Sequence, residues 1–450
     1  MGEGGIGLIR LSGDEAVGIA SSIIQTRNGQ PIQDRASHIL SLGHVRDPVT
    51  GERLDEVLFA VMRAPRTYTR ADTVEFYCHG GTLLLHRILD LLIRQGARLA
   101  EPGEFTKWAF LNGRIDLTQA EAVMDLIRAK TEAGQRAAMA QLEGGLHRQI
   151  VQLREEAVRL LAEIEAGIDF TEEDIHFLSP EQIRTQLSEI IGRVEALLKT
   201  AASGKALREG IATAIIGRPN VGKSSLLNAL LMQNRAIVTP VPGTTRDTIE
   251  EYLNLEGIPL RIIDTAGLRD TDDLVEREGI LRSRQAIKNA DLVILVLDQT
   301  QPVGLAERRL FEETADRRRL IVFNKVDILS KPTESPQQDY IFRDLAKPVY
   351  ISALTGKGMD DLKRAMLLEI RSGMITCGDR EAMINIRHKA LLSEARASLS
   401  IALNAVNDKA SSELISVDIR TAIDRLGEIT GTTTTDDLLN KIFKEFCIGK

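Results

Sequence analysis

The sequence predicts a multidomain protein that combines α/β parts with an all-helical part. Three changes of pattern along its 450 residues indicate this. Short β-rich runs alternate with helical stretches up to residue 117, and apolar residues then recur every three or four positions up to about residue 208. Near-continuous apolar runs separated by helix-length segments follow up to residue 373, which is typical of a parallel sheet covered on both faces.

Residues 1–117 are expected to form a small α+β domain, with strands such as "GIGLIRLSG" and "TVEFYCHGG" and a helix in "TLLLHRILDLLIRQG". Residues 118–208 and 374–450 each carry helices with one apolar stripe, which would be exposed if either segment stood alone. The sequence therefore predicts one helical domain made from both segments, with the α/β domain of residues 209–373 inserted between them. Pro180 is expected to start a helix after the interruption "GIDFTEEDIHFLSP".

The composition is typical of a soluble cytoplasmic protein, with 43% hydrophobic residues and no apolar run long enough to span a membrane. The start "MGEGGIGLIRLSG" lacks the features of a signal peptide. Cys78, Cys377 and Cys447 are too few for a disulfide framework and lack the spacing of a zinc site. A net charge of -7 argues against broad non-specific binding to nucleic-acid phosphates, although a local basic face remains possible.

The stretch "GRPNVGKS", Gly217 to Ser224, fits the phosphate-binding pattern G-x-x-x-x-G-K-[ST] between a predicted strand and a predicted helix. Its backbone N–H groups and the helix N-terminus favour phosphates, Lys223 can reach the β- and γ-phosphates, and Ser224 can bind Mg²⁺. The alternative is a glycine-rich turn that matches by chance.

Two further motifs follow in the expected order. In "RIIDTAGLRD", Asp264 can hold the metal through water and Gly267 can donate its N–H to the γ-phosphate. In "FNKVD", Asp327 can accept hydrogen bonds from the donors of guanine, Asn324 can serve its acceptor edge and Lys325 can pack over the base. Adenine would leave the carboxylate unpaired, so this site should select GTP. Alone, "NKVD" could also be a helix-capping turn.

The last motif is "ISAL", in which a backbone N–H of Ser352 to Leu354 can meet the guanine O6. The loop "VTPVPGTTRDT" offers Thr245 as the second Mg²⁺ hydroxyl. Leu268 follows "DTAG" and cannot orient an attacking water, so another group must do so. The predicted GTP-binding residues are Asn220, Val221, Gly222, Lys223, Ser224, Ser225, Thr239, Pro240, Val241, Pro242, Gly243, Thr244, Thr245, Asp264, Thr265, Ala266, Gly267, Asn324, Lys325, Asp327, Ser352 and Ala353.

The four motifs resemble those of the translation-factor-related GTPases. Nearly the whole chain resembles the MnmE (TrmE) family of tRNA-modification GTPases, through "PGEFTKWAFLNGRIDLTQAEAVMDLI", "GIDFTEEDIHFLS", "GRPNVGKSSLLNAL", "PGTTRDT", "DTAGLRD" with "VEREGI", and "FCIGK". The resemblance implies an N-terminal folate-binding domain, a helical domain and an inserted G domain. It also implies a homodimer through the N-terminal domains and G domains that pair across GTP.

The same resemblance implies K⁺ in place of an arginine finger and Glu276 as the residue that orients water. A monovalent cation beside the phosphates would neutralise charge that develops in the transition state. Asn220 could instead be an ordinary turn residue. The implied K⁺ ligands are Asn220, Thr239, Val241 and Thr244.

For the folate pocket, the resemblance implies binding of 5-formyltetrahydrofolate or a related one-carbon tetrahydrofolate by Arg10, Glu75, Arg114 and Lys450. We expect Arg10 and Lys450 to meet anionic groups of the ligand and Glu75 to bind donors of the pterin ring. Arg114 replaces the family's lysine, so its charge is kept but its geometry can differ. Relative to the family, the chain also starts almost directly on "GGIGLIRLSG", and loss of the preceding strand would expose a sheet edge.

Cys447 lies in the terminal "CIGK" tail, behind an amphipathic segment whose apolar residues are expected to dock on the helical domain and so deliver it to the pocket. Its thiol could act as a nucleophile, as an acid or base, or only as a wall of the pocket. It could equally be a small buried hydrophobe that anchors the tail. The docking residues are Leu438, Leu439, Ile442, Phe443 and Phe446.

In the function implied by the resemblance, the chain acts with the flavoprotein MnmG (GidA), which carries FAD, in a heterotetramer. The pair adds an aminomethyl or carboxymethylaminomethyl group at C5 of the wobble uridine, position 34, of certain tRNAs. Two alternatives remain open. One is a GTP-dependent switch or ribosome-assembly factor without modification chemistry, and the other is an interaction scaffold that uses GTP for structure alone.

Overall fold

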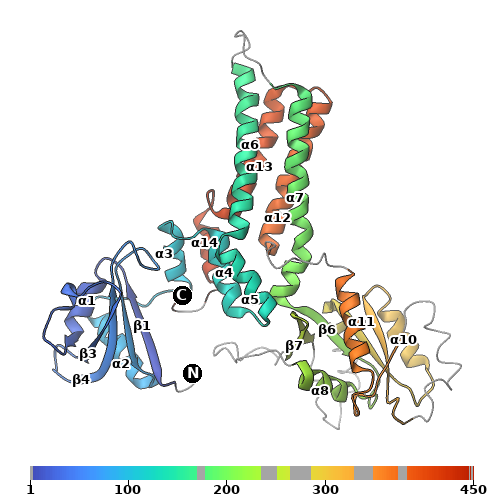
Figure 1. Cartoon of the computed structure of the whole chain (residues 1–450), viewed down its shortest axis with the longest axis horizontal. Coiled ribbons are helices and arrows are strands. Elements are labelled where there is room, and N and C mark those ends of the chain that lie inside the picture. Colours follow the sequence, from blue (N-terminus) through green and yellow to red (C-terminus); the bar gives the residue numbers. More distant parts are fainter. Residues whose placement is uncertain are drawn as a thin grey trace. The chain divides into compact units, whose positions relative to one another are not determined.

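A computed structural model describes residues 4–169, 178–234, 251–263, 285–328, 348–372, 383–444, 446 and 449 of the chain (Figure 1). The chain separates into two compact units. Met1–Met124 with Gly427–Lys450 form the first unit, and Asp125–Leu426 form the second. None of the described helices combines the length and the apolar character that spanning a bilayer requires.

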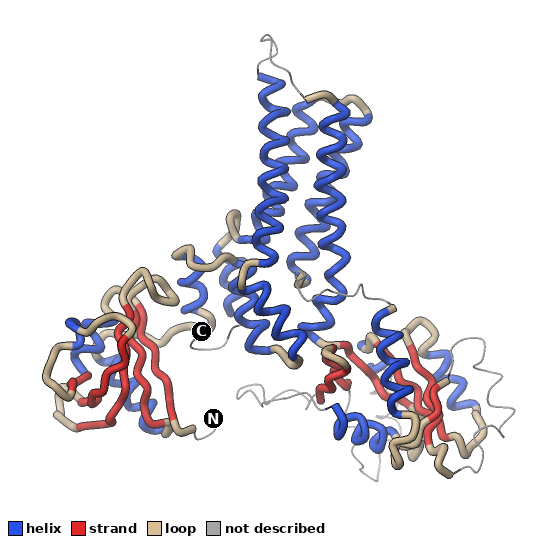
Figure 2. The backbone as a smooth tube through the Cα atoms, viewed as in Figure 1, coloured by secondary structure: helices blue, strands red, loops and turns tan. Residues whose placement is uncertain are grey.

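The first unit is built on a five-stranded antiparallel sheet in the order β1-β5-β4-β3-β2. Strands are drawn in red in Figure 2. One face of the sheet, with residues such as Ile9, Phe59 and Phe76, is buried against α1 and α2. The predicted α+β domain is confirmed. Its elements are β1 (Ile6–Ser12), α1 (Ala16–Ile23), β2 (Ile24–Thr26), a 3-10 turn η1 (Ile32–Asp34), β3 (Ile39–Arg46), β4 (Arg53–Met62), β5 (Thr73–His79) and α2 (Thr82–Arg94).

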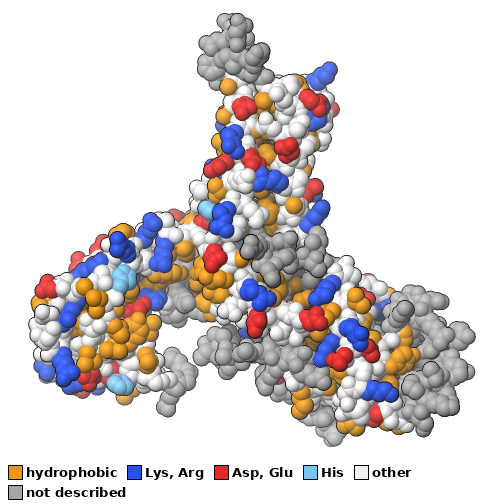
Figure 3. Space-filling model, viewed as in Figure 1, with side chains coloured by type: hydrophobic (Ala, Val, Ile, Leu, Met, Phe, Trp, Pro, Cys, Tyr) orange, Lys and Arg blue, Asp and Glu red, His pale blue; other side chains and the backbone are white. Residues whose placement is uncertain are grey.

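The opposite face of this sheet carries an apolar row that crosses four strands. The strand register places Leu8 beside Tyr77, Tyr77 beside Leu58, and Leu58 beside Leu42. Leu8 is 50% exposed and Leu58 is 41% exposed, although large apolar side chains are usually buried in strand centres. Hydrophobic side chains gather on the visible surface of this unit in Figure 3. We call Leu8, Tyr77, Leu58 and Leu42 the apolar row.

The C-terminal helix α14 (Asp436–Lys444) packs in the first unit with α3 (Glu104–Leu111) and α4 (Leu117–Arg128). Leu439, Phe443 and Phe446 are buried in one cluster with Leu117, Ala120 and Met124 of α4. These three side chains thus dock on α4, within the segment expected to begin the helical domain, and the helix also contacts α3, while Leu438 and Ile442 are half-buried.

The helical part of the second unit has its longest helices in α6 (Gly145–Asp169), α7 (Pro180–Glu209) and α12 (Ile386–Asn407). Ser179 caps α7 in a capping box with Gln182, and Pro180 occupies the first turn, as predicted. The helices α7 and α12, far apart in sequence, lie side by side, and the Arg184 Nε donates to the Asn407 Oδ1 at 2.8 Å. The helices α5 (Glu132–Leu142) and α13 (Ser412–Thr430) are also described, and the last four residues of α13, 427–430, are assigned to the first unit.

The α/β part of the second unit has a six-stranded sheet in the order β11-β10-β9-β6-β8-β7. All neighbouring pairs are parallel except β7 and β8. One face is buried against α8 and α11 and the other against residues 286–290 and the α10 region, so the predicted covered sheet is confirmed. The elements are β6 (Ile211–Ile216), α8 (Lys223–Asn234), β7 (Glu251–Leu255), β8 (Ile258–Ile263), β9 (Leu292–Asp298), α10 (Leu305–Glu313), β10 (Arg319–Asn324), β11 (Val349–Tyr350) and α11 (Met359–Arg371).

Candidate nucleotide-binding site

The loop between β6 and α8 has the backbone that the phosphate-binding motif requires. Gly217 has a φ of 152° and Gly222 has a φ of 96°. Residues other than glycine rarely adopt these backbone angles. A Cβ on Gly217 would lie 2.3 Å from the Val296 carbonyl oxygen, and one on Gly222 would lie 2.2 Å from the Asn324 Nδ2. Both glycines are therefore needed because the loop passes close to β9 and to the end of β10.

Lys223 is the first residue of α8, and its ammonium lies inside the loop. Its Nζ donates to the carbonyl oxygens of Gly217 at 3.1 Å and Arg218 at 2.8 Å. Burial lowers the pKa of Lys223 below its ordinary value. The ammonium thus lies beside the N-terminus of α8, where phosphate oxygens would be attracted by both the cation and the helix dipole. Ser224 follows it in the first turn of the helix, and Ser225 is exposed.

Asn324 ends β10 and joins two loops with its side chain, which is almost completely buried. Its Nδ2 donates to the Val221 carbonyl oxygen at 2.9 Å, and its Oδ1 accepts from the Ala353 N–H at 2.9 Å. The side-chain oxygen is thus engaged within the protein, and one hydrogen of the Nδ2 group is left for a further acceptor. One carboxamide therefore holds the phosphate-binding loop against the "ISAL" loop.

Lys325 follows directly and has a left-handed backbone, with a φ of 68°. Its Nζ lies 2.7 Å from the Asp298 Oδ2. Asp327 is exposed, so its carboxylate is accessible to hydrogen-bond donors. In the neighbouring loop Ser352 is fully buried and its N–H donates to the Lys357 carbonyl oxygen at 2.9 Å.

The "ISAL" loop leaves one backbone donor for a base. The N–H groups of Ser352 and Ala353 are both used within the protein. The N–H of Leu354 makes no hydrogen bond among the described residues, and the side chain is 86% exposed. Of the donors predicted to meet the guanine O6, Leu354 is therefore the one that remains available.

An ion pair between the phosphate-binding loop and α10 gives the loop another contact. The Arg218 Nη1 donates to the Glu307 Oε1 at 3.1 Å, and the other oxygen of Glu307 accepts from the Gly304 N–H at 2.9 Å. The Glu307 side chain is only 9% exposed, so the loop has a second anchor at Arg218 besides the one that Asn324 provides at Val221.

Several predicted site residues lie outside the described residues, and their predicted roles stay predictions. They are Thr239, Pro240, Val241, Pro242, Gly243, Thr244, Thr245, Asp264, Thr265, Ala266, Gly267, Glu276, Cys447 and Lys450.

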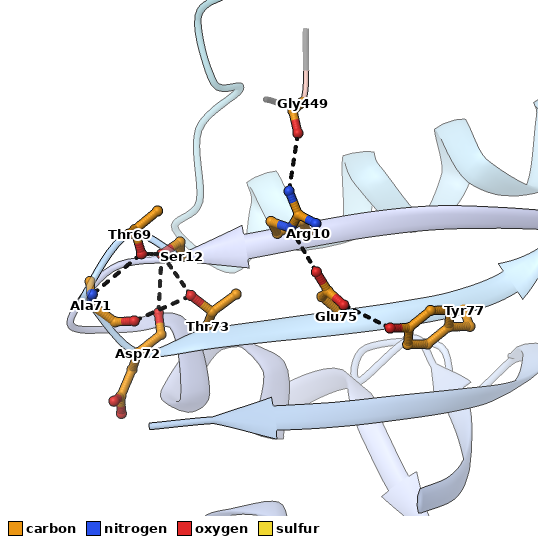
Figure 4. A network of polar contacts seen from close by, with 9 residues as sticks. All are labelled: Arg10, Ser12, Thr69, Ala71, Asp72, Thr73, Glu75, Tyr77 and Gly449. Atoms are coloured by element: carbon orange, nitrogen blue, oxygen red, sulfur yellow. Dashed lines mark hydrogen bonds and ion pairs between the residues drawn. The ribbon is translucent and has the colours of Figure 1, made fainter. Parts of the chain in front are cut away.

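A second polar cluster lies in the first unit and contains two of the predicted folate residues (Figure 4). Arg10 on β1 and Glu75 on β5 are register partners, and the Arg10 Nε donates to the Glu75 Oε1 at 2.7 Å. The Tyr77 hydroxyl donates to the other oxygen of Glu75 at 2.7 Å, a hydrogen bond that raises the pKa of Tyr77. The Arg10 Nη1 also donates to the Gly449 carbonyl oxygen at 3.3 Å, which brings the C-terminal tail to this cluster.

Arg114 has different contacts from the other predicted folate residues. Its Nη1 donates to the Thr67 carbonyl oxygen at 2.6 Å, and its guanidinium lies 5.0 Å from the ring centre of Tyr68. The same loop continues to Thr69, whose hydroxyl lies 2.6 Å from the Ser12 hydroxyl at the end of β1. Arg114 is thus connected to the Arg10 strand through this loop, and among the described contacts no hydrogen bond or ion pair joins it directly to Arg10 or Glu75.

Three site residues were missed by the sequence analysis: Asp298, Glu307 and Arg218. Asp298 had a signal, because it ends the apolar run "DLVILVLD" in the sequence in the same way as Asp264 ends "RIID". Glu307 had none, since it lies in a charged helix and only the fold brings it to the phosphate-binding loop.

The chain matches two sequence families. Residues 117–447 match the family described as the MnmE helical domain, and residues 1–114 match the GTP-binding protein TrmE N-terminus. Among curated relatives, the tRNA modification GTPase MnmE of Geobacillus thermodenitrificans is 47% identical over 456 residues, covering 100% of this chain and 97% of the relative. The proteins of the same name from Geobacillus kaustophilus and Thermoanaerobacter pseudethanolicus are 47% and 46% identical, with the same coverage.

Among solved structures, the G domain of the Thermotoga maritima FeoB iron transporter is 28% identical and aligns with a TM-score of 0.26. The alignment covers 35% of this chain and 96% of that domain.

Proposed function

Because this chain belongs to the MnmE (TrmE) family of tRNA modification GTPases, we propose that it hydrolyses GTP in the modification of tRNA. The observation that carries the nucleotide part is the Asn324 side chain, which joins the phosphate-binding loop to the "ISAL" loop. We also propose that the chain consists of three domains. They are an N-terminal domain (1–117), a helical domain (118–208 with 374–450) and a G domain (209–373) inserted into the helical domain.

In the proposed site, Lys223 binds the β- and γ-phosphates and Asp327 selects guanine. The donor set fits Mg²⁺, because Ser224 lies in the first turn of α8 directly after Lys223, and Thr245 would supply the second hydroxyl. Bound Mg²⁺ would neutralise charge on the phosphate oxygens. Glu276 orients the attacking water in this proposal, and the N–H of Gly267 donates to the γ-phosphate.

We also propose that K⁺ completes the site through Asn220, Thr239, Val241 and Thr244. The described part of this set is Asn220, which is exposed, has a φ of 62° and makes no hydrogen bond among the described residues. Its side-chain oxygen is thus available at the tip of the phosphate-binding loop. Turnover in KCl should exceed turnover in NaCl at equal ionic strength, and Asn220→Ala should reduce that difference. Equal rates in the two salts would contradict the ion's role.

The polar cluster of Figure 4 supports the proposal of a folate site. Arg10 is held by Glu75 with its guanidinium directed toward the C-terminal tail, where Gly449 precedes Lys450. In this proposal Arg10 and Lys450 bind the anionic groups of a ligand such as 5-formyltetrahydrofolate. Calorimetry with this ligand tests the site, and Arg10→Ala should weaken binding. Full binding by that variant would contradict the assignment.

The homodimer is supported by the apolar row of the N-terminal sheet. Leu8, Tyr77, Leu58 and Leu42 are neighbours across four strands, with Leu8 and Leu58 exposed and Tyr77 and Leu42 half-buried, and a second copy of the sheet would cover them. Leu8→Lys with Leu58→Lys places two like charges in that strip and should shift the protein to monomers in sedimentation equilibrium. A dimer of unchanged strength in this variant would place the interface elsewhere.

For the reaction itself, we propose a cytoplasmic heterotetramer with the flavoprotein MnmG (GidA), which carries FAD. Together they would add an aminomethyl or carboxymethylaminomethyl group at C5 of uridine 34. The test is nucleoside analysis of tRNA from a deletion strain that expresses this chain. Restored modification supports the proposal, and its absence beside full GTP hydrolysis would favour a switch without modification chemistry. Cys447→Ser in the same strain tests the thiol separately.

A further inference from the structure

A buried carboxylate with no assigned role lies beside the predicted guanine-recognition motif. Asp298 ends β9 and is the register partner of Asn324 on β10. Its side chain is 4% exposed. The Oδ2 accepts from the Lys325 Nζ at 2.7 Å, and the Oδ1 accepts from the Thr300 N–H at 2.9 Å and the Thr300 hydroxyl at 2.6 Å.

Lys325 provides the positive charge that makes this burial tolerable. Burial alone would raise the pKa of Asp298, but the hydrogen bonds from Lys325 and Thr300 outweigh it and leave the pKa below its ordinary value. A buried carboxylate without a cation is strongly destabilising, so the pair is a defined contact rather than a loose surface pair.

The pair also fixes the direction of the lysine side chain. The backbone of Lys325 is left-handed, and its Cα lies between two residues of the motif, Asn324 and Val326. With the Cα and the ammonium both held, the four-carbon chain between them has few rotamers left. A free lysine would have to lose that rotamer freedom each time a base bound.

We propose that Asp298 is a positioning residue for guanine binding, which anchors the Lys325 ammonium so that the lysine stem is preorganised as a wall of the base site. The inference rests on the GTP site proposed above. It assigns Asp298 no contact with the nucleotide. Its effect reaches the base only through Lys325.

The test measures GDP and inosine diphosphate affinity of the full-length chain by calorimetry in Asp298→Asn, Lys325→Met and the double variant. Asp298→Asn keeps the shape and an acceptor for Thr300 but removes the charge. Because the lysine side chain is no longer held in either single variant and must lose rotamer freedom when the base binds, each should bind GDP up to about tenfold more weakly. The double variant should also lose about tenfold rather than about a hundredfold, because both changes remove the same contact.

The two nucleotides separate positioning from general damage. Inosine lacks the exocyclic amine that Asp327 is predicted to read, whereas a lysine stem over the ring contacts both bases alike. Asp298→Asn should therefore weaken both nucleotides by the same factor and keep their ratio. A collapsed motif would instead reduce the preference for GDP, and that result would overturn the proposal.

Asp361→Asn is the matched control, since Asp361 forms an exposed pair with Arg364 in the same α/β part and should leave GDP affinity unchanged. Multiplicative losses in the double variant, or wild-type affinity in Asp298→Asn, would refute the role of Asp298. If Asp298→Asn does not fold, Asp298→Glu keeps the charge but displaces it, and should give a smaller loss in the same direction. A wild-type chain that binds no guanine nucleotide would defeat the proposed function as well.

Discussion

Replacing Phe443 by alanine should release the C-terminal helix from the first unit while the rest of that unit stays folded. The side chain is 2% exposed, and its ring centre lies 5.2 Å from that of Phe446 and 6.5 Å from that of Phe110. Truncation of a buried phenylalanine costs about 3–5 kcal/mol. Since α14 is a terminal helix held by few apolar side chains, most of this cost should fall on its docking.

A loss of about 3 kcal/mol raises the undocked population more than about a hundredfold, because each 1.4 kcal/mol is a factor of ten. Hydrogen exchange with mass spectrometry should show faster exchange in α14 and unchanged exchange in β4 and β5. When α14 undocks, the hydrogen bond from Arg10 to the Gly449 carbonyl oxygen should also be lost. 5-formyltetrahydrofolate should therefore bind more weakly. Lys441→Ala, an exposed change on the same helix, is the control and should alter neither measurement. Wild-type exchange of α14 in Phe443→Ala would refute the reasoning.

Three further predictions concern single groups. Gly222→Ala should abolish nucleotide binding in calorimetry without unfolding the chain, because its Cβ would lie 2.2 Å from the Asn324 Nδ2; retained binding would contradict the loop geometry. The hydrogen bond from Arg98 lowers the pKa of Glu104 from 4.5 to about 2, so the pair's stabilisation is complete above about pH 4.5 and is lost as the pH falls toward about 2. Carbon NMR of labelled glutamate should show that low pKa, and Arg98→Met should raise it. Burial raises the pKa of Cys78 to about 12, so iodoacetamide at pH 8 should leave it unmodified in the folded chain; rapid labelling would show an accessible thiolate.

Local patterns were enough for much of the fold. The spacing of glycine and lysine in "GRPNVGKS" predicted a loop between strand and helix, and the structure has β6 and α8 on either side. Ser179 with Pro180 marks the start of α7 in the sequence itself. Helical spacing also identified the buried side of α14, because every docking residue lies within one short segment.

Contacts between distant segments were less accessible to sequence reasoning. The pairing of Arg10 with Glu75 depends on the register of β1 against β5, which strand patterns alone do not determine. The engagement of Asn324 and Ala353 depends likewise on where β10 and β11 end. The packing of α14 on α3 and α4 likewise joins segments that are more than 300 residues apart in the sequence.

The shared carboxamide of Asn324 restricts how the base preference of this protein can be changed. Any substitution there would loosen the phosphate cradle together with the base loop, since both depend on the same two hydrogen bonds. Asp327 is exposed, and its predicted role is limited to the base. Redesign toward an unnatural purine should therefore begin at Asp327, where discrimination can be altered while affinity for the triphosphate is kept.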